Sequence, residues 1–194
     1  MKHTLLIITA LLLIVGCSSK KTDTDFTLWY DDGNKMSEII FTGVNEDGMI
    51  RGAETNWYEN GQKESEGSVY KMIKYDEIRY DGLWTYWYEN GKKDREVNYV
   101  DGHRTGFFTK WYKNGNKMEE GNYYLYSGRK GGLWTYWYEN GNKEKEGNYI
   151  IYDDGWTNSF SDKKEGVWTY YREDGTVNTV LDCDKIDCDS TFYD

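Results

Sequence analysis

The sequence predicts an all-β fold in which tandem β-hairpins form one elongated, twisted antiparallel sheet. Units of similar sequence recur with fixed spacing inside each unit and variable spacing between units, as expected of tandem structural modules. Each unit carries aromatic or β-branched residues before an Asn-Gly or Asp-Gly pair, a pattern typical of a strand that enters a tight turn. The units span residues 24–33, 52–61, 82–91, 106–115, 132–141 and 166–175.

The first residues indicate an export signal. Lys2 precedes an apolar stretch at 5–15, which is too short for a membrane-spanning helix of about 20 residues. The stretch ends in Ile-Val-Gly-Cys at 14–17, which resembles a bacterial lipobox. This resemblance implies that residues 1–16 are a lipoprotein signal peptide.

Cys17 is therefore expected to become the first residue of the mature chain and to carry the lipid. Two or three acyl chains would anchor the protein stably, whereas a single chain is marginal. Residues 17–25 would then comprise the lipidated cysteine and a polar tether. We expect an exported protein in the bacterial cell envelope, anchored to the outer membrane or the cell surface.

Residues 26–182 are predicted to form six hairpins. Each Asn-Gly pair, such as 90–91, is expected to have positive φ at both residues, as a type I′ turn requires. A charged run follows each turn and leads into a short segment such as Glu-Gly-Asn-Tyr at 146–149, which we interpret as the return strand. The chain has 9 Trp, 19 Tyr and 6 Phe but no Pro, so aromatic side chains should form the core of a largely uninterrupted sheet.

The unit also resembles a known repeat. Its pattern is Gly-x-Trp-x-x-Trp-Tyr-x-Asn-Gly-x-x-x-x-Glu-Gly-x-Tyr, similar to the variant of the MORN repeat (membrane occupation and recognition nexus) found in tandem in bacterial proteins. The resemblance covers about 24–182 and implies MORN-like hairpins laid side by side. It implies no catalytic residues, and some proteins with this repeat are labelled toxin–antitoxin antitoxins. The first and last units depart from the pattern, with Thr24 in place of Gly and Tyr171-Arg172 in place of Trp-Tyr.

Residues 183–194 are predicted to form a C-terminal cap rich in Cys and Asp. Lipidation would use Cys17, which leaves Cys183 and Cys188 as a pair in an exported protein, and a disulfide between them is the interpretation we prefer. Calcium binding is the alternative, because four carboxylates surround the pair, although the spacing of an EF-hand loop is missing. These carboxylates belong to Asp182, Asp184, Asp187 and Asp189.

The sequence does not predict an enzyme. It contains no Gly-x-Ser-x-Gly, no Walker loop and no His-Glu-x-x-His, and after residue 16 its one histidine is His103, in a predicted turn. We therefore expect no catalytic residues, no cofactor and no metal site. The formal net charge of -10 argues against nucleic acid as a partner, because phosphates require clusters of Lys and Arg.

Aromatic residues are predicted on both faces of the sheet. Alternation along the strand puts Trp84, Tyr86 and Tyr88 on one face and Trp87 on the other. We expect Trp84, with its equivalents Trp134 and Trp168, in the core. A single-layer sheet cannot bury every remaining aromatic ring, so some should be free to contact a partner. The candidate partner-binding residues are Tyr86, Trp87, Tyr136 and Trp137.

These features favour a non-catalytic repeat scaffold for protein–protein interaction at the cell envelope, with an unidentified envelope protein as its partner. A glycan-binding or cell-wall-binding module is an alternative, because aromatic clefts between hairpins can hold ligands by stacking and cation–π contact. An antitoxin or immunity role is a further alternative that rests on the family label. The lipid on Cys17 would supply the contact with the membrane.

Overall fold

The computed structural model describes residues 26–44, 48–72, 74–153 and 160–189 of this 194-residue chain. The predicted signal peptide, the predicted lipid attachment site Cys17 and the predicted tether lie outside the described residues. No helix within these ranges is long and apolar enough to cross a membrane.

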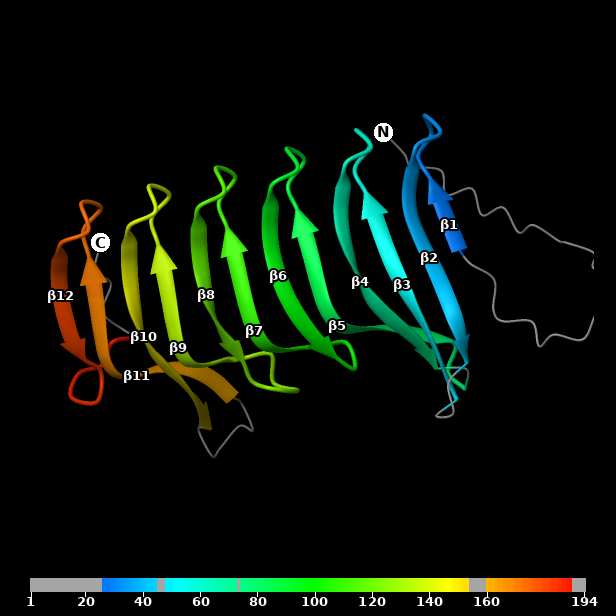
Figure 1. The fold of residues 1–194 in the computed structure, drawn as a ribbon. Coiled ribbons are helices and arrows are strands. Elements are labelled where there is room, and N and C mark those ends of the chain that lie inside the picture. The colour runs from blue at the N-terminus through cyan, green and yellow to red at the C-terminus, as the bar shows by residue number, and fades with distance from the viewer. Residues whose placement is uncertain (1–25, 45–47, 73, 154–159, 190–194) are drawn as a thin grey trace, which may run out of the picture.

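Twelve strands form one open antiparallel sheet in which spatial order follows chain order (Figure 1). The chain is therefore a meander, and the predicted all-β fold with tandem hairpins is confirmed. Each odd-numbered strand pairs with the next strand as a hairpin. The strands are β1 (Phe26–Trp29), β2 (Lys35–Val44), β3 (Met49–Trp57), β4 (Lys63–Met72), β5 (Glu77–Trp87), β6 (Lys93–Val100), β7 (His103–Trp111), β8 (Lys117–Tyr123), β9 (Lys130–Trp137), β10 (Lys143–Asp153), β11 (Phe160–Tyr171) and β12 (Val177–Asp182).

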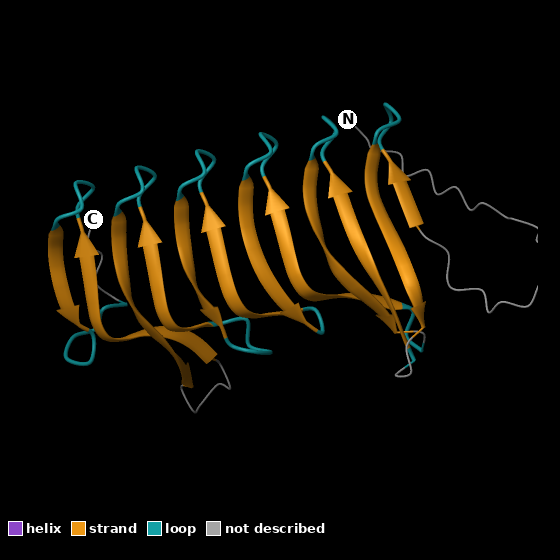
Figure 2. Ribbon diagram, viewed as in Figure 1, coloured by secondary structure: helices purple, strands orange, loops and turns teal. Residues whose placement is uncertain are grey.

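The hairpin turns line one long side of the sheet, and the connections between hairpins line the other (Figure 2). In the third hairpin, Gly91 N–H donates to the Tyr88 carbonyl and Tyr88 N–H donates to the Lys92 carbonyl, both at 2.8 Å. Gly91 has φ of +79°, whereas Asn90 is not among the residues with positive φ. The loop is therefore a type I turn followed by a left-handed glycine.

The predicted type I′ turn at Asn-Gly is thus wrong. Asn90 keeps negative φ because its side chain folds back onto the turn, where its Oδ1 accepts a hydrogen bond from Lys92 N–H at 3.0 Å. A turn with positive φ at both central residues occurs on the opposite side of the sheet, at Asp101 (+53°) and Gly102 (+77°). There it joins β6 directly to β7, with Val100 opposite His103.

Three tryptophans form the centre of the core, as the sequence predicted. Trp84, Trp134 and Trp168 have no exposed surface. Each ring lies flat on a glycine of the preceding strand, where an added Cβ would come within 2.3–2.4 Å of ring atoms. Each indole Nε1 also donates to a backbone carbonyl of that strand, at 2.9, 3.2 and 3.0 Å respectively. The glycines are Gly67, Gly121 and Gly147.

The fourth hairpin fills the same part of the core with a different pair of residues. Phe108 stands where the third, fifth and sixth hairpins have Trp, and the residue opposite it on the preceding strand is Val97 instead of Gly. Both are buried, at 5% and 1% exposure. The larger Trp ring therefore packs on Gly, which has no side chain, and the smaller Phe ring packs on Val, as close packing requires.

A bulge at the start of each of the last four units redirects the strand. Gly67 pairs with Trp84 and Ser68 pairs with Asp81, so Gly82 and Leu83 are left over on β5. Gly82 adopts φ of +73°, which a side chain would disfavour. The extra residues free the Ser68 carbonyl for the Trp84 indole and leave Leu83 half exposed on the opposite face.

The packing of Trp on Gly can be tested by replacing one Trp–Gly pair with the Phe–Val pair of the fourth hairpin. Gly121→Val should destabilise the chain by about 1–3 kcal/mol or more, because its side chain would overlap the Trp134 ring. Trp134→Phe alone should also destabilise it, by leaving a cavity. The double variant recreates the Val97–Phe108 pair, so its loss in the free energy of unfolding should be clearly smaller than the sum of the two single losses. Additive losses in denaturant titrations would contradict this packing.

Candidate functional site

Each hairpin is fastened to the next by a tyrosine. The Tyr that follows the second Trp of the unit donates its hydroxyl to a backbone carbonyl in the next hairpin, over 2.6–2.9 Å. Burial, together with the nearby Asp94 carboxylate, raises the pKa of Tyr88 to about 12. The donors are Tyr30, Tyr58, Tyr88, Tyr112 and Tyr138, and the acceptors are the carbonyls of Trp57, Trp87, Trp111, Trp137 and Tyr171.

The turn asparagines form a second set of contacts in the same direction. Asn90 Nδ2 donates to the Lys113 carbonyl at 3.1 Å. In each of the other four turns among the first five, an Asn in or beside the turn makes the equivalent bond to the next hairpin. The last hairpin has Arg172 and Asp174 at the Tyr and Asn positions. The hydrogen bonds of these two sets therefore all point toward the C-terminus and stop at the sixth turn.

The aromatic rings on the core face of the sheet are covered by neighbouring side chains of the same sheet. The Tyr80 ring stacks on Trp84 with centroids 3.9 Å apart, and Tyr99 meets both rings edge-on. Tyr86 packs beside Trp84, and the Arg95 guanidinium lies over the Tyr86 ring at 3.9 Å. Burial raises the pKa of Tyr86. Rings that a second layer would normally cover are thus covered by neighbours on the same sheet.

Lys130 fills an aromatic cage in the fifth hairpin. Its Nζ lies 4.1 Å from the Trp134 ring centroid, 4.9 Å from that of Tyr136 and 5.8 Å from that of Tyr149. The ammonium also donates to the Tyr136 hydroxyl at 2.8 Å and pairs with Glu119 at 3.0 Å. Such a cage suits a cationic ligand, but here the chain's own lysine occupies it.

The predicted candidates Tyr86 and Tyr136 are consequently not free aromatic anchors. Both are half-buried against the Trp core. Trp87 and Trp137 lie on the opposite face and are also half-buried, because Lys63 and Lys117 reach over their rings at 5.8 and 5.4 Å. These four rings are less accessible than expected because long cationic side chains can cover a ring from the same layer, whereas other rings, such as Phe107 and Trp29, are about half exposed.

The face opposite the core carries a ladder of alternating Thr and Glu. In the cross-strand register each Thr of an odd-numbered strand stands beside a Glu of an even-numbered strand, without interruption from β1 to β11. Each Glu pairs with the Lys three residues before it, as Glu66 does with Lys63 at 2.5 Å. The Thr residues are Thr27, Thr55, Thr85, Thr109, Thr135 and Thr169, and the Glu residues are Glu38, Glu66, Glu96, Glu120 and Glu146.

An exposed apolar row runs beside this ladder. Four residues that follow the leading Gly of their units have 51–58% of their surface exposed. Neighbouring strands lie about 4.8 Å apart, so these side chains recur at roughly 9.6 Å intervals. Asparagines stand opposite three of them in the register. The apolar row consists of Leu83, Phe107, Leu133 and Val167. The row is not apparent from the sequence because the bulge that exposes these residues is a tertiary feature.

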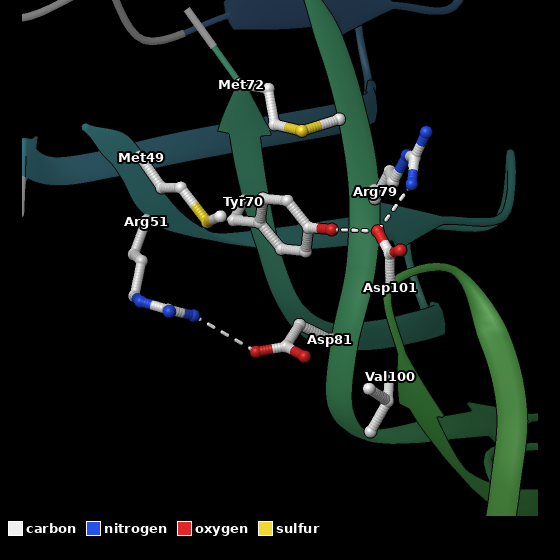
Figure 3. Close-up of a pocket in the computed structure, with 8 residues that line it drawn as sticks. All are labelled: Met49, Arg51, Tyr70, Met72, Arg79, Asp81, Val100 and Asp101. Atoms are coloured by element: carbon white, nitrogen blue, oxygen red, sulfur yellow. Dashed lines mark hydrogen bonds and ion pairs between the residues drawn. The ribbon is translucent and has the colours of Figure 1, made fainter. Parts of the chain in front are cut away.

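One shallow hollow of about 330 Å³ lies between β3, β4, β5 and the turn after β6 (Figure 3). At its centre Asp101 accepts hydrogen bonds from the Tyr70 hydroxyl and the Arg79 guanidinium, which lower the pKa of the carboxyl. Arg51 pairs with Asp81 at 3.1 Å at its rim. The charged groups of the hollow are thus paired within the chain, and the network fastens the Asp101 turn to two preceding strands.

At the C-terminal end, a disulfide joins Cys183 and Cys188, with Cα atoms 5.3 Å apart. Both cysteines pack against Trp168. The Asp184 carboxylate accepts from Gly166 N–H at 2.9 Å, and Asp182 pairs with Lys185 at 2.5 Å. In the part of the chain that the structure describes, no three His, Cys, Asp or Glu side chains gather as metal ligands would.

Comparison with known proteins supports the repeat. Three segments, residues 51–72, 80–101 and 130–150, match the family described as MORN repeat variant. They correspond to the hairpins β3–β4, β5–β6 and β9–β10. No curated protein matches the chain.

Among solved structures, the chain is similar to one titled "Crystal structure of GtfA/B complex bound to UDP and GlcNAc", at 9% identity and a TM-score of 0.23. The match covers 84% of this chain and 28% of that one, so this chain spans just over a quarter of its length. A similarity this low supports no inference about fold or function.

Stability should fall in alkaline solution. Tyr70 and Tyr88 have pKa values raised from 10.0 to about 12, so above pH 10 the unfolded chain loses these phenolic protons before the folded chain does. The free energy of unfolding should therefore decrease between pH 10 and about pH 12, which denaturant titrations at several pH values would measure. Tyr88→Phe should make the decrease shallower. An unchanged slope in that variant would contradict a protonated Tyr88 hydroxyl as the donor to Trp111.

Proposed function

We propose that this chain, which carries MORN-variant repeats, is a non-catalytic scaffold that binds a protein partner at the bacterial cell envelope. In this proposal the chain is exported, and acyl chains on Cys17 anchor it to the outer membrane or the cell surface. The observation that carries the binding role is the apolar row. Its four side chains are more than half exposed and lie at one position of four successive hairpins, whereas the rings of the Trp core are covered within the chain.

The surroundings of the apolar row suit a protein surface. Binding interfaces commonly have an apolar centre and a polar rim. Here Leu83 and its equivalents form the centre, and the Thr–Glu ladder with its lysines forms one rim. Phe107 and Leu133 lie in the middle of the row, Phe107 is its largest side chain and Leu133 is its most exposed, so they are the expected anchors. Trp87 and Trp137 lie on the same face beyond the ladder and would contribute at its margin.

A catalytic role has less support. The strongest cluster of titratable groups, Tyr70, Arg79 and Asp101, is paired internally, and its hollow is shallow. A binding module for glycans or quaternary ammonium groups also has less support, because Lys130 occupies the cage of Trp134 and its neighbouring tyrosines. An antitoxin role rests on family labels, and a lipid anchor would hold the protein away from a cytoplasmic toxin.

The binding role can be tested on the apolar row. The variant Phe107→Ser with Leu133→Ser should lose proteins that the unaltered chain retains from an envelope extract, because it removes the apolar centre of the face. Both side chains are exposed, so melting should change little. Tyr75→Ser is the matched control: its side chain is 63% exposed but lies in a connection between hairpins, so it should retain the same proteins. Equal retention by the double variant would refute the proposal.

The anchor can be tested separately. Cys17→Ala removes the thiol that would accept the lipid, so the variant should leave the detergent phase in phase-partitioning experiments. Its precursor should also keep residues 1–16. Partitioning identical to that of the unaltered chain would show that the lipoprotein assignment is wrong, without bearing on the apolar row.

A further inference from the structure

Both ends of the sheet are unusually apolar for edge strands. In the described part of the chain, β1 has β2 as its neighbour and β12 has β11. Edge strands commonly carry Lys, Pro or another feature that prevents pairing with other chains. β1 has the sequence Phe-Thr-Leu-Trp, and β12 has Val-Asn-Thr-Val-Leu-Asp. On these two strands Phe26, Trp29, Val177 and Val180 are 47%, 55%, 53% and 58% exposed.

The apolar residues of β12 occupy positions that are charged in every other hairpin. The return strands β2, β4, β6, β8 and β10 each place a Lys and, three residues later, a Glu on the face opposite the core. In β12 the same register positions hold Val177 and Val180: Val177 is opposite Tyr171 as Lys143 is opposite Trp137, and Val180 is opposite Thr169 as Glu146 is opposite Thr135. A terminal repeat that served only as a cap would be expected to present a more polar outer side.

The N-terminal edge is complementary to these two valines. Inside the sheet, Lys35 of β2 reaches over Trp57 of β3 at 5.6 Å, and Glu38 stands opposite Thr55. Trp29 and Thr27 of β1 are the equivalents of Trp57 and Thr55, and no strand precedes β1 in the described sheet. If β1 of a second copy lay beside β12 in the same register, Trp29 would lie on Val177 and Thr27 would stand opposite Val180.

We propose that copies of this chain associate head to tail, with β12 of one copy pairing antiparallel with β1 of the next and continuing the sheet. The contact joins two different surfaces, so it can add further copies in a row. It leaves the apolar row and the Thr–Glu ladder open on the face opposite the core. Association would therefore extend both surfaces across several molecules.

The junction between copies is weaker than the junctions within the chain. Each internal junction has a Tyr and an Asn that donate to the next hairpin, whereas the last hairpin has Arg172 and Asp174. Arg172 is turned back on its own hairpin, where it donates to the Val177 carbonyl at 2.9 Å. The association is consequently reversible and depends on concentration.

Charged substitutions at Thr27 and Val180, which would lie opposite each other between two copies, test the contact. The chain from residue 17 onward contains every described strand, and Cys17→Ser in it removes any contribution from lipid. In sedimentation velocity over a wide concentration series, the average mass of this protein should rise with concentration. Adding Thr27→Lys and Val180→Lys places two lysines opposite each other only at the junction between copies, and association should weaken at least about tenfold. Thr27→Lys with Val180→Glu places opposite charges there, keeps the new lysine beside Glu38 of β2 as in the Lys–Lys variant, and should restore association.

Two further variants make the result decisive. Arg172→Tyr with Asp174→Asn supplies the missing donors and should strengthen association. Unchanged melting curves for the lysine pair would show that its effect is on assembly and not on folding. The proposal is overturned if the unaltered protein stays monomeric throughout, or if association responds equally to the Lys–Lys and Lys–Glu pairs.

Discussion

The packing of a tryptophan ring on a glycine of the neighbouring strand is the constraint on which this fold depends. A one-layer sheet has no second layer to bury its apolar side chains, so the rings must lie flat and cover each other. Trp84 can do so because Gly67 leaves room for it, and the bulge at Gly82 frees the Ser68 carbonyl for the indole N–H. One glycine thus permits ring burial, and the other permits its hydrogen bond.

Flat packing also explains why the chain has so many cations beside its rings. A Trp lying on the sheet still exposes one ring face, and a long side chain is the group that can reach it from the same layer. Tyr80 covers Trp84, Lys130 covers Trp134 and Lys164 lies over Trp168 at 5.3 Å. Each cover is four residues before its Trp, so one position in the unit serves this purpose with either an aromatic or a cationic side chain. The same logic operates on the opposite face, where Lys63 covers Trp87.

The sequence predicts local features well because the repeat places them in a fixed order. The strands, the turns and the buried Trp84 follow from residue types and spacing. The turn type does not, because Asn90 can occupy either a positive or a negative φ, and the observed negative φ goes with a hydrogen bond that the Asn90 side chain accepts from Lys92 N–H. The exposure of Tyr86 does not either, because its cover is Arg95 on the adjacent strand. The Thr–Glu ladder could have been found, since Thr85 and its equivalents recur at one position of the unit and only their cross-strand partners were needed.

The two faces of the sheet therefore differ in how many substitutions their residues can tolerate. On the core face, each side chain is fixed by a ring, a glycine or a bulge, so changes must be compensated nearby. On the opposite face, Leu83 and its equivalents lie at the backbone bulge with more than half of their surface exposed, so they bury less apolar area than the core rings. An apolar group retained at such a position in four successive hairpins has no explanation in folding, since a polar residue would be better solvated there. Contact with another molecule gives these residues a physical reason to be apolar, which is why the apolar row and not the aromatic core is the surface to which binding is assigned.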